Sequence, residues 1–226
     1  NIRQINGISG FLKRDESVHD IFGAGHASTS ISAALGFAHA RDMENLNSQV
    51  LAIIGDGAMT GGLAYEGINN LGYHRSQLTI VLNDNSHSIS KSVGALSHYL
   101  TRVATNPTYN RIRNDIWEIS GKMPMSKHIR KFLRKTEEGI KGYLTPGAFF
   151  EDLGLRYIGP IDGHNMKELL YTFKAVKKMN TPVLVHVYTQ KGKRSKLAEK
   201  DAIKYYSIQG EINNSSGSVS ELDYSK

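Results

Sequence analysis

The chain has 226 residues, of which 39% are hydrophobic and 22% charged, a usage typical of globular domains that excludes collagen-like repeats and disordered polyelectrolytes. No stretch approaches the ~20 apolar residues that cross a bilayer, so we expect no membrane partner, and the absence of cysteine excludes disulfides, thiolate metal sites and cysteine nucleophiles. The net charge of +7 lies largely in residues 127–135 and 191–200, which indicate solvated surface rather than a nucleic-acid partner because no recognisable nucleic-acid-binding module accompanies them.

Helical and strand patterns alternate along the first part of the chain. Residues 28–42 predict a helix that its first three residues, Ser, Thr and Ser, can cap. Residues 50–54 (VLAII) predict a buried parallel strand. Residues 62–70 predict a second helix, ended by an Asn-Asn-Leu-Gly sequence, and residues 78–82 (LTIVL) predict the next buried strand.

The same alternation continues in the second part of the chain. Residues 126–141 predict a basic amphipathic helix, and Pro146 opens another short helix. Residues 157–161 have a weak strand pattern, residues 166–176 predict an amphipathic helix, and residues 183–188 (VLVHVY) predict the last strand. Strands that alternate with helices predict an α/β fold, a mostly parallel sheet with helices on both faces.

Polar residues follow the predicted strands at the places where such sheets bind ligands, beyond their carboxyl ends. Glycines on either side of Asp56 let the backbone approach an anion, and the N–H groups of Gly57 and Ala58 can face a phosphate. The Asp56 carboxylate and the Asn85 amide oxygen are hard ligands suited to Mg²⁺. Gly-Asp-Gly or Asn-Asp-Asn alone is usually a turn or loop, but the two together after parallel strands favour a site for a divalent metal and a diphosphate.

This pair of motifs resembles the thiamine diphosphate signature of transketolase-like enzymes, which begins with Gly-Asp-Gly and closes on an Asn. Longer stretches resemble the 1-deoxy-D-xylulose-5-phosphate synthase family more closely, and the likeness runs from about residue 6 to residue 206. The stretches are FGAGHASTSISAALG, GDGAMTGGLAYEGINNLG, LTIVLNDNSHSISKSVGALSHYL and TEEGIKGYLTPGAFFEDLGLRYIGPIDGHNM.

The resemblance implies a transketolase-like diphosphate-binding fold and a transferase that uses thiamine diphosphate and Mg²⁺. The family condenses pyruvate with D-glyceraldehyde 3-phosphate, releases CO₂ and forms 1-deoxy-D-xylulose 5-phosphate, the first step of the non-mevalonate route to isoprenoids. The thiazolium of the cofactor is the electron sink, so the protein positions and tunes it. Transketolase or the E1 component of a 2-oxo acid dehydrogenase is the alternative, because both share the short signature.

The resemblance also implies roles for particular residues. Asp56 and Asn85 would be side-chain ligands of the metal, and His87 would offer its backbone carbonyl. On its own, His26 before a helix is more often a surface or capping residue, but the motif favours a diphosphate contact. The implied cofactor-binding residues are Gly25, His26, Ala27, Gly57, Ala58, Asn85 and Lys191. The loop after Lys191 departs from the family pattern, with Arg194 and Ser195 where a glycine and an aromatic residue are expected.

We expect residues 1–210 to form the diphosphate-binding domain, incomplete at its N-terminus, and the polar, Ser-rich residues 211–226 to be a linker. The family resemblance implies a pyrimidine-binding domain and a C-terminal domain beyond this chain. The pyrimidine-binding domain would carry the activating glutamate, so no catalytic residue is expected here and the chain alone should be inactive. We expect a homodimer in a plastid-type organelle (plastid or apicoplast) or a bacterial cytoplasm.

Overall fold

The computed structural model describes residues 6–85, 95, 99 and 147–200. The chain forms two compact units, Asn1–Gln190 and Lys191–Lys226. The described part of the second unit contains the short helix α9 (Lys196–Lys200). The predicted basic helix at 126–141, the proline at 146 and the predicted boundary at 210 lie outside the described residues.

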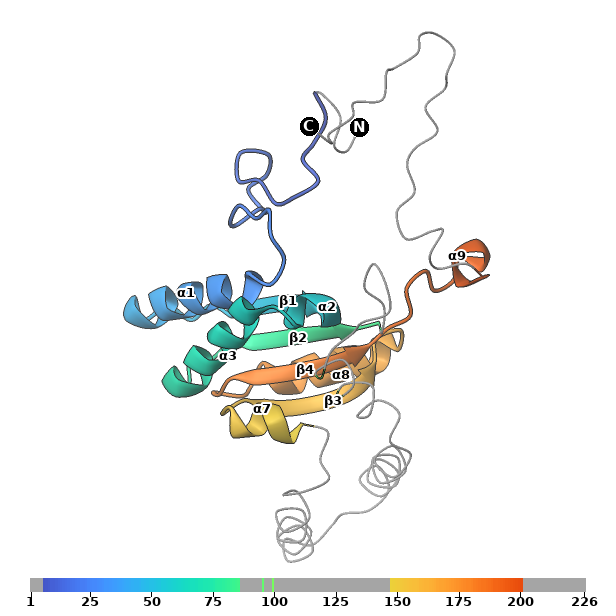
Figure 1. The fold of residues 1–226 in the computed structure, drawn as a ribbon. Coiled ribbons are helices and arrows are strands. Elements are labelled where there is room, and N and C mark those ends of the chain that lie inside the picture. The colour runs from blue at the N-terminus through green and yellow to red at the C-terminus, as the bar shows by residue number, and fades with distance from the viewer. Residues whose placement is uncertain (1–5, 86–94, 96–98, 100–146, 201–226) are drawn as a thin grey trace, which may run out of the picture. The chain divides into compact units, whose positions relative to one another are not determined.

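Four parallel strands form the sheet that the described residues show, in the order β1-β2-β4-β3 (Figure 1). They are β1 (Leu51–Gly55), β2 (Thr79–Asp84), β3 (Arg156–Asp162) and β4 (Val183–Tyr188). Gly55 lies opposite Asn83, and Asp84 lies opposite Tyr188. The carboxyl ends of β1, β2 and β4 therefore meet at one edge of the sheet, as parallel pairing requires.

Helices cover both faces of this sheet, which confirms the predicted fold class. Helices α1 (Ser30–Met43), α2 (Asp56–Met59), α3 (Gly62–His74) and α7 (Ala148–Asp152) contribute to the core on one face, and α8 (Met166–Val176) packs on the other. The first core is centred on the fully buried Ile31, Met59, Ile68, Leu71, Ile80, Leu82, Phe150 and Leu184. The second contains Val81, Ile161, Val176, Val183, Val185 and Val187. Each fully buried side chain of this size stabilises the fold by roughly 1.5–3 kcal/mol.

Strand β1 departs from its prediction on one face. Ala52 and Ile54 are buried in the first core, but Leu51 and Ile53 are 48% and 64% exposed. The cause is the position of β1 at the edge of the described sheet, where no described helix covers its second face. A continuous apolar run predicts a strand, but it does not distinguish burial on one face from burial on both.

Helix α3 also departs from its prediction, because it runs through the expected Asn-Asn-Leu-Gly stop and ends at His74. Leu71 is fully buried in the first core, so tertiary packing outweighs the weak helix propensity of the sequence. Gly72 is needed for close packing, since a Cβ there would lie 1.8 Å from the carbonyl oxygen of Leu153. Arg75, in the left-handed conformation at φ 55°, ends the helix instead.

Helix α1 begins two residues later than predicted, and its expected caps are not formed. Thr29 is the N-cap residue and makes no side-chain capping hydrogen bond, while Ser28 lies outside the helix at φ 72°. Helix α8 and strand β4 have the predicted bounds. In the ranges that the structure describes, no helix is both long and apolar enough to cross a membrane.

Candidate functional site

The turn after β1 carries three of the predicted site residues. Asp56 is the first residue of α2 and is only 7% exposed. Gly57 and Ala58 follow it in the first turn of this helix, where backbone N–H groups have no intrahelical acceptor. One turn thus combines a carboxylate with two backbone N–H donors, the chemistry that a metal-bound diphosphate needs.

A loop from earlier in the chain is joined to this turn. The hydroxyl of Ser28 donates a hydrogen bond of 2.6 Å to the carbonyl oxygen of Ala58. Gly25, His26 and Ala27 are exposed and immediately precede Ser28, so this bond holds their loop beside α2. Because Thr29 is the N-cap of α1, the structure assigns no capping role to His26.

The end of β2 carries the second half of the predicted signature. Asn83 and Asp84 are still part of the strand, and Asn85 is the first residue beyond it. The side-chain oxygen of Asn83 accepts a 2.7 Å hydrogen bond from the hydroxyl of Thr189, and the carbonyl of Asp84 accepts one of 2.8 Å from the Thr189 N–H. The β1–β2 register brings Asp56 and Asn85 to neighbouring strand ends.

His87 lies outside the described residues, so its predicted metal contact stays a prediction. Across the described ranges, no group of three or more His, Cys, Asp or Glu side chains could hold a metal. That finding does not bear on the predicted ligand set, because the set contains only one ligand atom from such a side chain, in the Asp56 carboxylate. The other two ligands would be an amide oxygen and a backbone carbonyl.

Sequence reasoning missed a row of three polar side chains beneath the strand ends, which we call the buried polar row: Asp84, His186 and Tyr157. The Asp84 Oδ2 lies 3.0 Å from His186 Nε2, and His186 Nδ1 lies 2.6 Å from the Tyr157 hydroxyl. His186 is fully buried and Asp84 is 3% exposed. A neutral imidazole with its proton on Nε2 satisfies both contacts, donating to the carboxylate and accepting from the phenol. The available signal was a histidine inside the apolar strand VLVHVY.

The Asp162-Gly163-His164 segment forms a structural turn, in which the His164 N–H donates to the Asp162 carboxylate at 2.8 Å. The Gly163 N–H donates to the carbonyl of Tyr188, and the His164 Nε2 accepts from the Gln190 N–H, both at 2.8 Å. A Cβ on Gly163 would lie 2.5 Å from the Thr189 side chain, so the close approach requires glycine. This turn fastens the chain just beyond β4.

Lys191 belongs to the second unit, so its predicted cofactor contact stays a prediction. In its loop, Gly192 and Arg194 both have φ 74°. The Arg194 N–H donates to the Glu199 carboxylate at 2.8 Å, and the Ser195 N–H donates to the carbonyl of Gly192 at 2.9 Å. The residues that depart from the family pattern thus form a turn closed by local hydrogen bonds.

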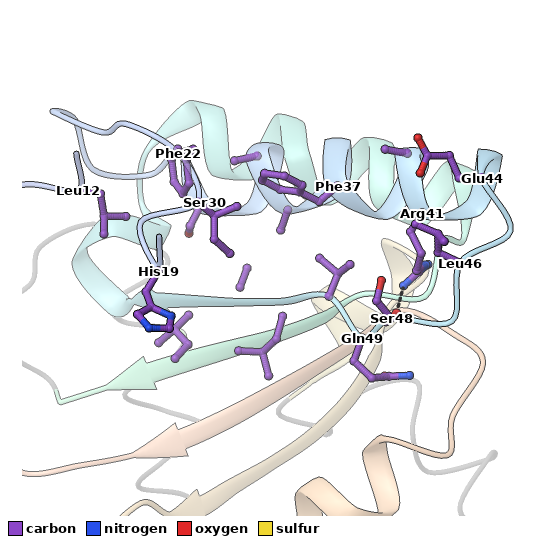
Figure 2. A pocket seen from close by; sticks show the side chains of 18 residues that line it. Leu12, His19, Phe22, Ser30, Phe37, Arg41, Glu44, Leu46, Ser48 and Gln49 are labelled. Carbon is purple, nitrogen blue, oxygen red and sulfur yellow. Dashed lines mark hydrogen bonds between the residues drawn. The ribbon is translucent and has the colours of Figure 1, made fainter. Parts of the chain in front are cut away.

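A groove of about 730 Å³ lies elsewhere, between α1, the edge strand β1 and the loop that precedes α1 (Figure 2). Its lining is mostly apolar and includes Leu12, Phe22, Phe37 and Ile53. At one end, the buried Arg41 donates to the carbonyls of Gln77 and Ser48 at 2.8 Å and 3.4 Å. None of the predicted cofactor or metal residues lines this groove, so it is separate from the strand-end site.

Comparisons with known proteins match the sequence over most of its length. A family model described as 1-deoxy-D-xylulose-5-phosphate synthase matches residues 1–189. A protein of that name from Caldanaerobacter subterraneus is 50% identical over 207 residues, which cover 91% of this chain and 33% of the relative. One from Clostridium kluyveri is 48% identical over 219 residues, 96% of this chain and 35% of the relative. A solved transketolase from Campylobacter jejuni is 18% identical, with a TM-score of 0.48, over 74% of this chain and 21% of that one. The chain spans about a third of the length of the Caldanaerobacter and Clostridium relatives.

Proposed function

This chain belongs to the 1-deoxy-D-xylulose-5-phosphate synthase family, and we propose that it supplies the diphosphate- and Mg²⁺-binding half of a thiamine diphosphate site. In this proposal the whole protein is a transferase that condenses pyruvate with D-glyceraldehyde 3-phosphate. It releases CO₂ and forms 1-deoxy-D-xylulose 5-phosphate, the first step of the non-mevalonate route to isoprenoids. Family membership favours this reaction over those of transketolase and 2-oxo acid dehydrogenases.

The observation that carries the proposal is the parallel pairing of β1 with β2, with Gly55 opposite Asn83. It brings the Asp56 carboxylate and the Asn85 amide to adjacent strand ends. A carboxylate and an amide oxygen suit Mg²⁺, which requires near-octahedral oxygen coordination and shares phosphate oxygens readily. The donor set of this chain therefore fits a metal-bound diphosphate.

Each residue of the site has a defined task in this proposal. Asp56 and Asn85 hold the metal, together with the backbone carbonyl of His87. The N–H groups of Gly57 and Ala58 donate to the diphosphate. The loop of Gly25, His26 and Ala27 closes on the diphosphate from the side that Ser28 fastens to α2, and Lys191 adds a further cofactor contact. When bound, thiamine diphosphate supplies the electron sink for decarboxylation of pyruvate.

The rest of the site lies on parts that this chain does not supply. We propose that a pyrimidine-binding domain provides the activating glutamate, that a C-terminal domain completes the protein, and that the enzyme is a homodimer. Residues 1–210 are then the diphosphate-binding domain, and residues 211–226 are the linker. The relatives reported above are bacterial, which favours a bacterial cytoplasm over a plastid-type organelle.

A full-length hybrid tests the proposed function, with this chain in place of the matching third of the Caldanaerobacter relative. We expect the hybrid to form 1-deoxy-D-xylulose 5-phosphate from pyruvate and glyceraldehyde 3-phosphate in the presence of Mg²⁺. The matched control is the same hybrid with Asp56→Ala, which should lose cofactor binding and turnover together. A folded hybrid with no product, or one that transfers two-carbon units between sugar phosphates instead, would contradict the proposal.

A further inference from the structure

Strand β4 and Thr189, the residue directly after it, hold the end of β2 at three points, immediately before Asn85. The Thr189 hydroxyl donates to the side-chain oxygen of Asn83 at 2.7 Å, and the Thr189 N–H donates to the carbonyl of Asp84 at 2.8 Å. The third point is the contact of 3.0 Å between His186 Nε2 and the Asp84 carboxylate. The side chains of the last two residues of β2 and the carbonyl of Asp84 are thus held by the neighbouring strand and by the residue directly after it.

The buried polar row extends this support to a third strand. His186 is fully buried, and its Nδ1 contacts the hydroxyl of Tyr157 on β3 at 2.6 Å. The rings of Tyr157 and Phe150 stack with centroids 6.0 Å apart, which limits how far the phenol can move. Because the imidazole is contacted at both nitrogens, it has one orientation that serves both partners.

We propose that His186 and Thr189 are positioning residues that set the place of Asn85 as a metal ligand. The inference deepens the proposed function and rests on it. Mg²⁺ tolerates little departure from octahedral geometry, so the direction in which the chain leaves β2 decides whether the Asn85 amide reaches the metal. Residues that orient metal ligands without touching the metal typically change its affinity by about 10- to 100-fold.

Two substitutions of His186 separate this role from general support of the sheet. In His186→Gln the side-chain N–H₂ group replaces Nε2 and keeps a donor for Asp84, whereas in His186→Asn the side-chain oxygen replaces Nδ1 and keeps the acceptor for Tyr157. We expect His186→Asn to raise the dissociation constant of Mn²⁺, a paramagnetic substitute for Mg²⁺, by about tenfold or more. His186→Gln should raise it less. The measurement is water-proton relaxation on the 226-residue chain with thiamine diphosphate and Mn²⁺.

Thr189→Val provides a second variant that is nearly isosteric and leaves the buried polar row intact. It removes the hydroxyl that holds Asn83, so we expect weaker Mn²⁺ binding with little change in melting temperature. Thr172→Val, at a buried threonine on α8 away from the strand ends, is the control substitution of the same type and should leave Mn²⁺ binding unchanged. Unaltered Mn²⁺ affinity in both Thr189→Val and His186→Asn would overturn the inference. So would equal losses of Mn²⁺ affinity in His186→Asn and His186→Gln that are accompanied by equally lowered melting temperatures.

Amide hydrogen exchange on the metal-free chain tests the positioning itself. We expect His186→Asn to speed exchange at residues 83–85 while Ile80 and Val81 keep their protection; uniform acceleration along β2, or none, would contradict the inference. Asp56→Ala distinguishes the two proposals. If the unmutated chain does not bind Mn²⁺, or if Asp56→Ala binds Mn²⁺ as tightly as the unmutated chain, the proposed function fails. If Asp56→Ala loses Mn²⁺ affinity and His186→Asn does not, only the positioning role is refuted.

Discussion

Removal of the Ser28 hydroxyl should weaken cofactor binding, because its bond to the carbonyl of Ala58 joins the two segments that we propose to hold the diphosphate. The Ala58 carbonyl also accepts the Gly61 N–H at 3.3 Å, so Ser28→Ala leaves no orphaned acceptor. The loss in binding free energy then reaches at most the net value of one hydrogen bond, about 1 kcal/mol, since the bond acts by holding the loop in place before the cofactor binds. That limit corresponds to a dissociation constant for Mg²⁺–thiamine diphosphate that is up to roughly fivefold higher.

Ser28→Gly provides the internal control, because Ser28 has φ 72°. A left-handed conformation costs a residue with a Cβ roughly 1–2 kcal/mol, and glycine avoids that cost. We therefore expect Ser28→Gly to melt at a higher temperature than Ser28→Ala, although both have the same weakened cofactor affinity. Calorimetric titration of the full-length hybrid measures the affinity, and thermal unfolding measures the stability. Wild-type affinity in both folded variants would refute the reasoning.

Three further predictions follow from the site and the core. In the hybrid, Asp56→Ala should weaken Mg²⁺–cofactor binding at least tenfold, about 1.4 kcal/mol, and unchanged affinity by calorimetry would contradict its role as a ligand. His26→Ala should weaken cofactor binding while circular dichroism shows an intact fold. An unaltered dissociation constant for the cofactor would show that His26 is only a surface residue. Gly72→Ala should lower the melting temperature, because its Cβ would clash with the Leu153 carbonyl. Gly36→Ala, in α1 with open space around it, should raise the melting temperature through up to about 1 kcal/mol of stabilisation. Equal shifts in melting temperature would argue against the close packing at Gly72.

Local patterns predicted the fold well where one periodicity dominates. The amphipathic spacing of α8 and the apolar run of β4 gave their observed bounds. The errors arose where a distant partner decides the outcome. Burial of Leu71 in the core extends α3 beyond the predicted stop. The Ser28 hydroxyl donates to the carbonyl of Ala58 and does not cap α1.

The site was predictable to the extent that parallel topology determines it. Because adjacent parallel strands end at the same edge, the spacing of Asp56 and Asn85 after two apolar runs was enough to predict that they lie close. The buried polar row was not predictable, because Asp84 and His186 are 102 positions apart and their contact depends on β4 lying next to β2. No local pattern carries that strand order.

The most direct test of the central claim is CO₂ release from pyruvate and glyceraldehyde 3-phosphate by the purified 226-residue chain, with and without the remaining two thirds of the Caldanaerobacter relative as a separate chain. Thiamine diphosphate must be held at its diphosphate and its aminopyrimidine at once, and we assign only the first task to this chain. We predict no turnover by either part alone and measurable turnover, dependent on Mg²⁺, when the two are mixed. Clear multiple turnovers by the 226-residue chain alone would contradict the account.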